Sequence, residues 1–260
     1  MKRQLALVTG ASSGIGKEIA RLLAEKGYDL LLVSRNKDRL SATRKELQKE
    51  GVMVSAIAID LSLPGAEEKV FSFTRSKGMD VDILVNNAGF GVYGQHVKSD
   101  ISRVGSMLNL NILSLTGLCR LYGSEMKRRR RGRILNIAST AAFQPTPSFA
   151  AYGASKSYVL NFSEALAKEL EDHGVTVTCL SPGATQTDFF RVARGVHHVK
   201  PLASFPRMSP EMVAQVGIDA LFRGRLDAVP GFRNKFLIFL VRLFPRTMVA
   251  RISKNMMYKR

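Results

Sequence analysis

The chain has 260 residues, of which 45% are hydrophobic and 23% charged, and its formal net charge at pH 7 is +18. These are values of a globular protein, and the length is that of one large α/β unit with a substantial core. Cys119 and Cys179 are too few for a disulfide framework, which excludes a disulfide-stapled scaffold and is typical of a reducing compartment. No signal peptide precedes the first predicted strand, so we expect a cytoplasmic protein.

Short apolar runs alternate with helical patterns along most of the chain. The expected strands are 5–9, 28–34, 52–59, 81–85, 134–138 and 175–180, with helices at 37–50 and 65–77 and a long helical region that ends at Arg130. Right-handed crossovers between such strands make a doubly wound parallel α/β sheet, in which ligands bind at the carboxyl ends of the strands. We expect one domain over residues 1–230 and a basic helical extension over 231–260.

A glycine-rich turn joins the first strand to the first helix. The apolar run Leu5–Thr9 leads into Gly10-Ala-Ser-Ser-Gly14-Ile-Gly16, and a helical pattern follows directly. Glycines here let the backbone approach a pyrophosphate, whose charge the helix N-terminus stabilises. The spacing is G-x-x-x-G-x-G, not the commoner G-x-G-x-x-G. Taken alone, these glycines also fit an ordinary tight turn.

A second pattern carries acid–base chemistry. Tyr152 and Lys156 are four residues apart, which places them on the same face of a helix. A phenol titrates near pH ~10, and a neighbouring ammonium lowers that pKa because it favours the phenolate. Ser139 follows the predicted strand 134–138, where its hydroxyl can hydrogen-bond the same oxygen that the phenol serves. A Tyr-x-x-x-Lys pair by itself is more often a pair of surface residues.

In combination these motifs are specific. The glycine-rich turn, Asn86-Asn-Ala-Gly89, Ser139, Tyr152 and Lys156 follow one another in the order typical of the short-chain dehydrogenase/reductase superfamily, which the chain resembles over residues 4 to about 229. The resemblance implies a Rossmann-type fold and an NADP-dependent oxidoreductase that interconverts a carbonyl and an alcohol by hydride transfer. It also implies association as a homodimer or homotetramer, through the two long helices that flank the strand before Ser139.

The resemblance assigns four catalytic residues. Tyr152 exchanges a proton with the carbonyl oxygen, Ser139 orients the carbonyl, and Lys156 binds the nicotinamide ribose and lowers the pKa of Tyr152. Asn111 kinks a long helix and holds a water next to the lysine. From the sequence alone, Asn109 competes for this last role, and the family pattern favours Asn111.

The end of the second strand indicates NADP(H). No carboxylate follows Val33, and Arg35 is suited to a 2′-phosphate, with Arg39 one turn further on. The alternative is that Arg35 only solvates a helix start. Ser13 departs from the pattern, because many NADP-using relatives have a basic residue there. The predicted cofactor-binding residues are Gly10, Ser12, Ser13, Gly14, Ile15, Gly16, Ser34, Arg35, Arg39, Asp60, Asn87, Ala88, Gly89, Tyr152, Lys156, Pro182, Gly183, Thr185 and Thr187.

Two of these positions have specified roles. Asp60 matches the family position that contacts the adenine, and otherwise it would cap a helix start. Thr187, with Thr185, is expected to hold the carboxamide. Phe143, Pro145, Phe149, Phe189, Phe190 and Val192 flank the motifs and indicate an apolar cleft for an oily ketone, a steroid-like ring or an acyl chain.

Other charged and metal-binding patterns are weak. His197 and His198 are adjacent and therefore point apart, and no carboxylate or cysteine supports them, so we predict no metal site. Six of the seven residues from Lys127 to Arg133 are basic. They close a helix, where cations offset the negative end of the dipole, and they precede the strand that leads to Ser139. We predict a solvated surface there and no nucleic-acid binding.

The C-terminal extension is cationic and apolar. From Arg223 to Arg260 there are ten basic residues and one acid, a net charge of +9. The apolar run Phe236–Val241 is far shorter than the ~20 residues that span a bilayer. On a helix, Lys235, Arg242 and Arg246 fall on one face, interrupted by Phe239, and the apolar residues Phe236, Leu237, Leu240, Val241 and Phe244 lie away from it. We expect the extension both to cover part of the substrate cleft and to contact a membrane surface peripherally. The alternative is that it only packs on the domain. The alternative function for the whole chain is a non-catalytic dinucleotide-binding module, or a membrane-associated one that binds a partner.

Overall fold

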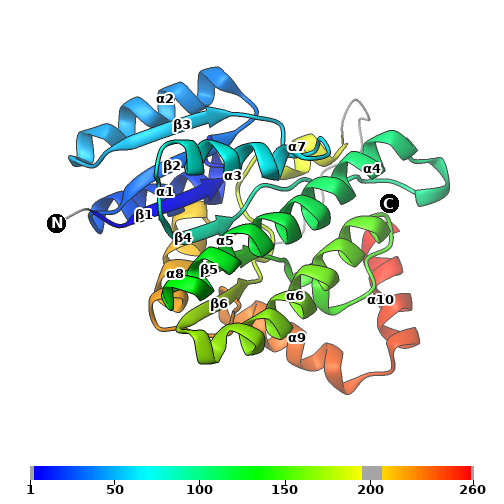
Figure 1. Cartoon of the computed structure of the whole chain (residues 1–260). Coiled ribbons are helices and arrows are strands. Elements are labelled where there is room, and N and C mark those ends of the chain that lie inside the picture. Colours follow the sequence, from blue (N-terminus) through cyan, green and yellow to red (C-terminus); the bar gives the residue numbers. More distant parts are fainter. Residues whose placement is uncertain (1–2, 195–206, 259–260) are drawn as a thin grey trace.

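The computed structural model describes residues 3–194 and 207–258 and has the predicted doubly wound architecture (Figure 1). Within these residues, seven parallel strands form one sheet in the order β3-β2-β1-β4-β5-β6-β7. The strands are β1 (Leu5–Thr9), β2 (Asp29–Ser34), β3 (Val54–Ala58), β4 (Val81–Asn86), β5 (Gly132–Ile137), β6 (Val175–Leu180) and β7 (Asp227–Ala228). The strand order reverses between β1 and β4, so the switch point at which such sheets bind ligands lies there.

Helices cover both faces of the sheet (Figure 1). They are α1 (Gly14–Glu25), α2 (Lys37–Leu47), α3 (Ala66–Ser76), α4 (Ile101–Leu108), α5 (Leu115–Arg129), α6 (Ala150–Leu170), α7 (Phe189–Arg194), α8 (Pro210–Phe222), α9 (Phe232–Leu243) and α10 (Arg246–Tyr258). A π-helical segment, η3 (Asn109–Ser114), joins α4 to α5. Short 3-10 turns are η1 (Gln48–Glu50), η2 (His96–Lys98), η4 (Thr140–Phe143) and η5 (Glu171–His173).

Burial on both faces explains the continuous apolar strands. In β2, Leu30 and Leu32 pack into the cluster under α1, α2 and α8, whereas Leu31 and Val33 pack into the cluster under α3, α5 and α6. Successive side chains of a strand point to opposite faces, so a strand covered on both sides needs apolar residues throughout. The pattern thus specifies a parallel sheet.

The sequence prediction was incomplete beyond residue 180. The strand 175–180 was expected to be the last, but β7 extends the sheet by pairing with Cys179 and Leu180 of β6. A strand of two residues leaves no pattern to detect. The helix α8 was also missed, and it packs on α1, with Val213, Ile218 and Leu221 fully buried.

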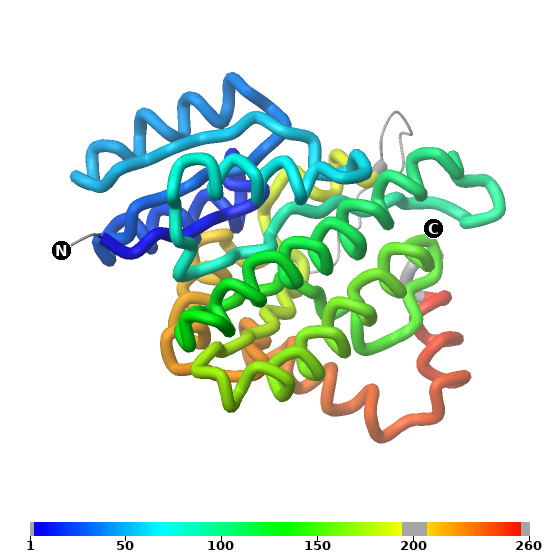
Figure 2. The backbone as a smooth tube through the Cα atoms, in the orientation of Figure 1, coloured from blue at the N-terminus to red at the C-terminus, as the bar shows by residue number. Residues whose placement is uncertain are grey.

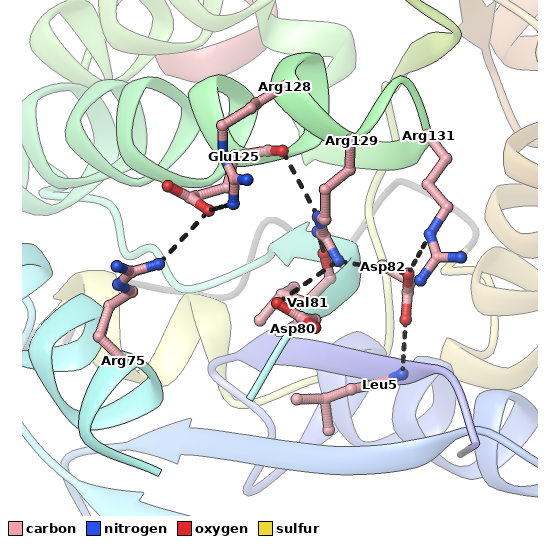
Figure 3. Close-up of polar contacts among 9 residues, drawn as sticks. All are labelled: Leu5, Arg75, Asp80, Val81, Asp82, Glu125, Arg128, Arg129 and Arg131. Atoms are coloured by element: carbon pink, nitrogen blue, oxygen red, sulfur yellow. Dashed lines mark hydrogen bonds and ion pairs between the residues drawn. The ribbon is translucent and has the colours of Figure 1, made fainter. Parts of the chain in front are cut away.

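The basic run at the end of α5 is only partly solvated (Figure 3). Buried Asp82 accepts a hydrogen bond from the Leu5 amide at 3.1 Å and lies 3.6 Å from the Arg129 guanidinium and 3.4 Å from that of Arg131. Arg128 pairs with Glu125 at 2.7 Å on the surface. The side chain of Arg129 is 14% exposed, so this part of the run stabilises the fold and the prediction of a solvated surface was wrong for it.

The extension forms two helices that meet at Pro245, as the sequence allowed (Figure 2). The amides of Met248 and Val249 donate to the Pro245 carbonyl, so the proline stands at the start of α10. In the part of the chain that the structure describes, none of the helices is both long and apolar enough to cross a bilayer.

Candidate active site

Thr9 and Asn87 connect β1 to β4 at the switch point. The Thr9 hydroxyl accepts from the amides of Asn87 and Ala88, both at 3.0 Å, and donates to the Val85 carbonyl at 3.2 Å. The Asn87 side chain donates to the Thr9 carbonyl at 2.9 Å. A β-carbon on Gly16 would lie 2.2 Å from the Asn87 amide nitrogen, so only glycine permits this close approach. Sequence reasoning missed Thr9, whose position at the end of the first strand was the available signal.

The N-terminus of α1 suits an anion. Ser13 precedes the helix in an extended conformation and its side chain makes no capping hydrogen bond, while the first turn contains no acid. The first amides of a helix have no intrahelical acceptor, and they carry the positive end of the dipole. Gly14 has φ +55°, and a β-carbon there would approach Thr187 to 2.9 Å. The residues present therefore fit the pyrophosphate of a dinucleotide.

A single cavity of about 820 Å³ runs from this turn to the catalytic residues. The predicted residues that line it are Gly10, Ser12, Ser13, Gly14, Ile15, Ser34, Arg35, Asp60, Asn87, Ala88, Gly89, Ser139, Tyr152, Lys156, Pro182, Gly183, Thr185 and Thr187. Gly16, Arg39 and Asn111 lie outside the lining. Gly16 packs under Asn87, Arg39 forms an ion pair, and Asn111 lies behind Gly89.

Tyr152 and Lys156 lie on the first two turns of α6 and are both buried. The Lys156 ammonium donates to the Ile137 carbonyl at 2.8 Å and lies 5.9 Å from the centre of the Tyr152 ring. The Ser139 hydroxyl accepts from the Ala141 amide at 3.1 Å, which orients it at the end of β5. The three side chains therefore meet on one wall of the cavity.

The structure distinguishes the two asparagines that competed for the position next to the lysine. Asn111 is buried in the π-helical segment, where its side chain donates to the Phe90 carbonyl and to the Ser155 hydroxyl at 3.0 and 3.1 Å. A β-carbon on Gly89 would lie 3.0 Å from the Asn111 carbonyl oxygen and 3.5 Å from Lys156 Nζ, so the two side chains are neighbours. Asn109 instead donates to the Ser62 carbonyl at 2.7 Å, away from the lysine.

Burial is the main cause of the pKa shifts of Tyr152 and Lys156. It raises the pKa of Tyr152 to about 12, although the Ser139 hydroxyl opposes the shift. It lowers the pKa of Lys156 to about 8. The sequence predicted that the ammonium would lower the tyrosine pKa. In the protein without coenzyme, burial outweighs any such effect, because removal from water disfavours the charged form of both groups.

The end of β2 has the composition of a phosphate site. Arg35 is exposed at the cavity and makes no hydrogen bond or ion pair with any residue that the structure describes. The hydroxyls of Ser12 and Ser34 lie 2.8 Å apart and join the glycine-rich turn to this strand. Asp60 accepts from the Ser62 amide and hydroxyl, and it does not cap α3, whose N-cap is Gly65.

Aromatic rings form the opposite end of the cavity. Phe149 lies 5.7 Å from Tyr152 between ring centres, and Phe189 lies 5.1 Å from Tyr152. Of the predicted apolar residues, those in the lining are Phe143, Phe149, Phe189, Phe190 and Val192, whereas Pro145 is not among them.

The extension contributes to the same cavity, beside which the sequence prediction placed it. Leu237, Ile238 and Val241 of α9 line it. A β-carbon on Gly183 would lie 2.6 Å from the Asn234 side chain, so α9 also contacts the turn after β6. Asn234 was not predicted, and a polar residue in an apolar tail was the available signal.

Metal-binding groups do not cluster in the described residues. No set of three or more histidine, cysteine or acidic side chains within ranges 3–194 and 207–258 could hold an ion. His197 and His198 lie outside the described residues.

The fold and the cavity define a dinucleotide-binding protein of the Rossmann type. A sequence model of the short chain dehydrogenase family matches residues 4–195, and the chain therefore belongs to that family. It is 34% identical over 194 residues to the very-long-chain 3-oxoacyl-CoA reductase of Pyrenophora tritici-repentis, an alignment that covers 73% of this chain and 57% of the relative.

Two further comparisons agree with membership of this family. Over 189 residues the chain is 33% identical to 17-beta-hydroxysteroid dehydrogenase type 3 of Mus musculus, covering 71% of this chain and 61% of that protein. The chain thus covers less than two thirds of the length of either curated relative. The structure is similar to a short-chain dehydrogenase from Sphingobium yanoikuyae in complex with NADPH, with a TM-score of 0.81, 31% identity, and coverage of 92% and 94%.

Proposed function

We propose that this protein is an NADP(H)-dependent oxidoreductase that interconverts a carbonyl and an alcohol on an apolar substrate. One observation carries the proposal: Ser139, Tyr152 and Lys156 line the same cavity as the glycine-rich turn. The names of the relatives, which act on acyl and steroid compounds, and the NADPH complex of the similar structure support the same chemistry.

Each catalytic side chain has a specific task. Bound NADP(H) supplies or accepts the hydride at the substrate carbon. Tyr152 gives a proton to the carbonyl oxygen during reduction, and its raised pKa keeps the phenol protonated at neutral pH. The Ser139 hydroxyl hydrogen-bonds the same oxygen. Lys156 holds the nicotinamide ribose hydroxyls, and Asn111 positions the backbone of Phe90 and the helix that carries the lysine.

The coenzyme preference rests on the end of β2. A 2′-phosphate needs a cation in place of the carboxylate that ends this strand in NAD-binding folds, and the unpaired Arg35 after Ser34 meets that condition. Arg39 is one turn further on and already pairs with Asp188, so it is the secondary contact. The remaining predicted residues then hold the adenine, the pyrophosphate and the carboxamide, as the sequence assigned them.

The substrate is bulky and apolar. Beyond Tyr152 the lining consists of Phe149, Phe189 and Phe190 from the domain and of Leu237 and Val241 from α9. Such a wall favours an oily ketone, a steroid-like ring or an acyl chain over a sugar, whose hydroxyls would lose hydrogen bonds to water there.

The test is a substrate panel followed by NADPH absorbance. Ketones, steroids and acyl compounds should be reduced by the wild-type protein and not by the Tyr152→Phe variant. NADPH binding without turnover of any apolar carbonyl would support the alternative, a non-catalytic dinucleotide-binding module. Failure to bind either coenzyme would reject both.

Assembly and location complete the proposal. We expect a homodimer or homotetramer in the cytoplasm that associates through α5 and α6. Tyr158 of α6 is 39% exposed, and Leu113 of η3, the segment that precedes α5, is 62% exposed. Light scattering at micromolar concentration should show more than one chain per particle, and a monomer would reject this assembly. Peripheral contact of residues 231–260 with a membrane is also part of the proposal, and its surface is derived below.

A further inference from the structure

The helix α9 is apolar on two opposite faces. Its inner face, made by Leu237, Ile238 and Val241, lines the substrate cavity. Its outer face is formed by large side chains at spacings of four, three and four residues, which align along one side of a helix. These are Phe232, Phe236, Phe239 and Leu243, with exposed fractions of 81%, 50%, 57% and 63%.

This finding changes the pattern expected from the sequence. From the sequence, Phe236, Leu237 and Val241 were expected together on the side away from Lys235 and Arg242. In the structure Leu237 and Val241 line the cavity, although Leu237 is also 51% exposed, whereas Phe236 and Phe239 are exposed and lie outside the lining. Packing on the domain therefore accounts for only half of the apolar side chains.

Exposed apolar side chains also occur beyond α9, at Phe244 and on α10. Phe244, Met248 and Ile252 are each between 46% and 47% exposed. We call these three residues and the outer face of α9 the C-terminal docking face. Contiguous exposed apolar surface of this kind marks a contact site, because single scattered apolar residues are what an ordinary surface shows.

Free cations surround the docking face. On α9, Lys235 and Arg242 flank the outer face on one side and Arg233 flanks it on the other, and all three are exposed. On α10 the exposed cations are Arg246, Arg251 and Lys254. None of these six forms an ion pair or a side-chain hydrogen bond with a described residue, so their charges are available to a partner.

The charge identifies the partner. Residues 231–260 contain eight basic residues and no acid. A second copy of the chain docked through the same face would place these charges against one another, which opposes a symmetric contact. An anionic lipid surface instead offers negative headgroups to the cations and acyl chains to the aromatic rings. At 12 residues, α9 is about 18 Å long, which suits a helix in the plane of the interface and not one across a bilayer.

We propose that the C-terminal docking face binds the surface of an anionic bilayer and that the apolar substrate enters the cavity from this bilayer along α9. The route follows from Phe232, which lines the cavity and is also 81% exposed at the start of the outer face. Docking therefore places the cavity wall against lipid, and an oily ketone can pass from acyl chains to the aromatic wall without crossing water. Binding of the docking face to a bilayer does not depend on the proposed oxidoreductase function. The entry route does rest on that function.

The first test is sedimentation of the full chain with phosphatidylserine-rich or pure phosphatidylcholine vesicles. Wild type should bind the anionic vesicles and release in high salt. The triple variant Phe236→Ser, Phe239→Ser, Leu243→Ser and the triple variant Lys235→Glu, Arg242→Glu, Arg246→Glu should each bind at least about tenfold more weakly. None of these six side chains lines the cavity.

Matched control variants test whether vesicle binding depends on the docking face or on exposed apolar and basic residues in general. Val97→Ser with Ile101→Ser removes apolar side chains that are 91% and 74% exposed elsewhere, and Lys45→Glu with Lys49→Glu and Lys77→Glu reverses three exposed charges away from the extension. Both should bind vesicles as wild type does. All variants should bind NADPH normally, which shows that they fold. Equal vesicle binding by wild type and by the docking-face variants would overturn the proposal.

The entry route has its own readout. With an apolar ketone dissolved in anionic vesicles, the docking-face variants should show a KM raised at least about fivefold, while kcat and the KM for a water-soluble ketone stay unchanged. An unchanged KM for the vesicle-borne ketone would overturn the entry route. Loss of turnover with every ketone would instead count against the proposed function, and the sedimentation result would be unaffected.

Discussion

Arg39 and Asp188, which are 149 positions apart in the chain, form an ion pair at 3.0 Å between α2 and the segment after β6. Arg191 pairs with the same carboxylate at 2.9 Å. The two arginines lower the pKa of Asp188 to about 2, Arg191 contributing more, so the carboxylate stays charged at any working pH. A 2′-phosphate that uses Arg39 must therefore compete with Asp188.

We predict that Asp188→Asn tightens NADPH binding by about two- to fivefold, because exposed pairs of this kind contribute at most about 1 kcal/mol. NADH lacks the phosphate, so its affinity should stay unchanged. Fluorescence titration of both coenzymes measures the effect. An equal gain for NADH would show that the carboxylate does not act on the phosphate.

Arg35→Ala should weaken NADPH binding by about tenfold or more, since a charge-assisted contact to phosphate is lost. NADH binding should be nearly unchanged. Lys49→Ala, an exposed cation outside the cavity, serves as the control in the same titration. A variant that keeps the full preference for NADPH would remove Arg35 from the site.

Tyr152→Phe should lower kcat by a factor of about 10² to 10⁴, the usual range for loss of a general acid. NADPH affinity should stay within about twofold, because only the phenolic oxygen is removed. Lys156→Met should damage both coenzyme binding and turnover, since we assign that residue to the ribose and it lies beside Tyr152. Near-normal turnover by Tyr152→Phe with any substrate would contradict the proton-transfer role.

The buried lysine makes a prediction about pH and stability. Its pKa is about 8 in the folded protein and 10.5 in the open chain, so the folded state releases the proton first. The free energy of unfolding therefore gains a contribution that is fully present above the unfolded pKa and is lost as pH falls through the folded one. Burial raises the pKa of Cys119 to about 12, of Cys179 to about 11, and of Tyr122 and Tyr152 to about 12, so these groups act with the opposite sign as pH rises through their ordinary values of 9.0 and 10.0. Comparison with a variant that keeps all four groups isolates the contribution of the lysine.

Urea unfolding at pH 7.5 and 9, values chosen as roughly the start of this window, tests the assignment. The free energy of unfolding of wild type relative to Lys156→Met should rise over the interval. A difference that is flat or falls would show that the lysine is not held in a desolvated site. Glu125→Gln, a change at an exposed surface pair, should leave the difference unaltered.

Asp82 should contribute strongly to stability. It is buried, accepts from the Leu5 amide and pairs with Arg129 and Arg131, so Asp82→Ala should cost about 3 kcal/mol by removing the buried carboxylate beside a largely buried guanidinium. Asp80 lies 3.9 Å from the same Arg129 but is 56% exposed, and Asp80→Asn should cost less than about 1 kcal/mol. If both variants lost the same free energy of unfolding in chemical denaturation, burial would not be what distinguishes Asp82 from Asp80.

The sequence by itself determined the parts of the protein that depend on neighbours along the chain. A continuous apolar run specifies a buried parallel strand, and glycines between a strand and a helix specify the close turn, as Gly16 against Asn87 shows. A spacing of four puts Tyr152 and Lys156 on one helix face. The absence of an acid after Val33 could also be seen before any fold was known.

Tertiary structure decided what depends on residues that are distant in sequence. It separated Asn111 from Asn109, because a π-helical segment turns one toward Gly89 and the other toward Ser62. It raised the pKa of Tyr152, because burial sums over every element packed around the site. It also turned half of the apolar residues of α9 to the cavity and left half exposed, since a helix apolar on two faces has no preferred side until it meets the domain.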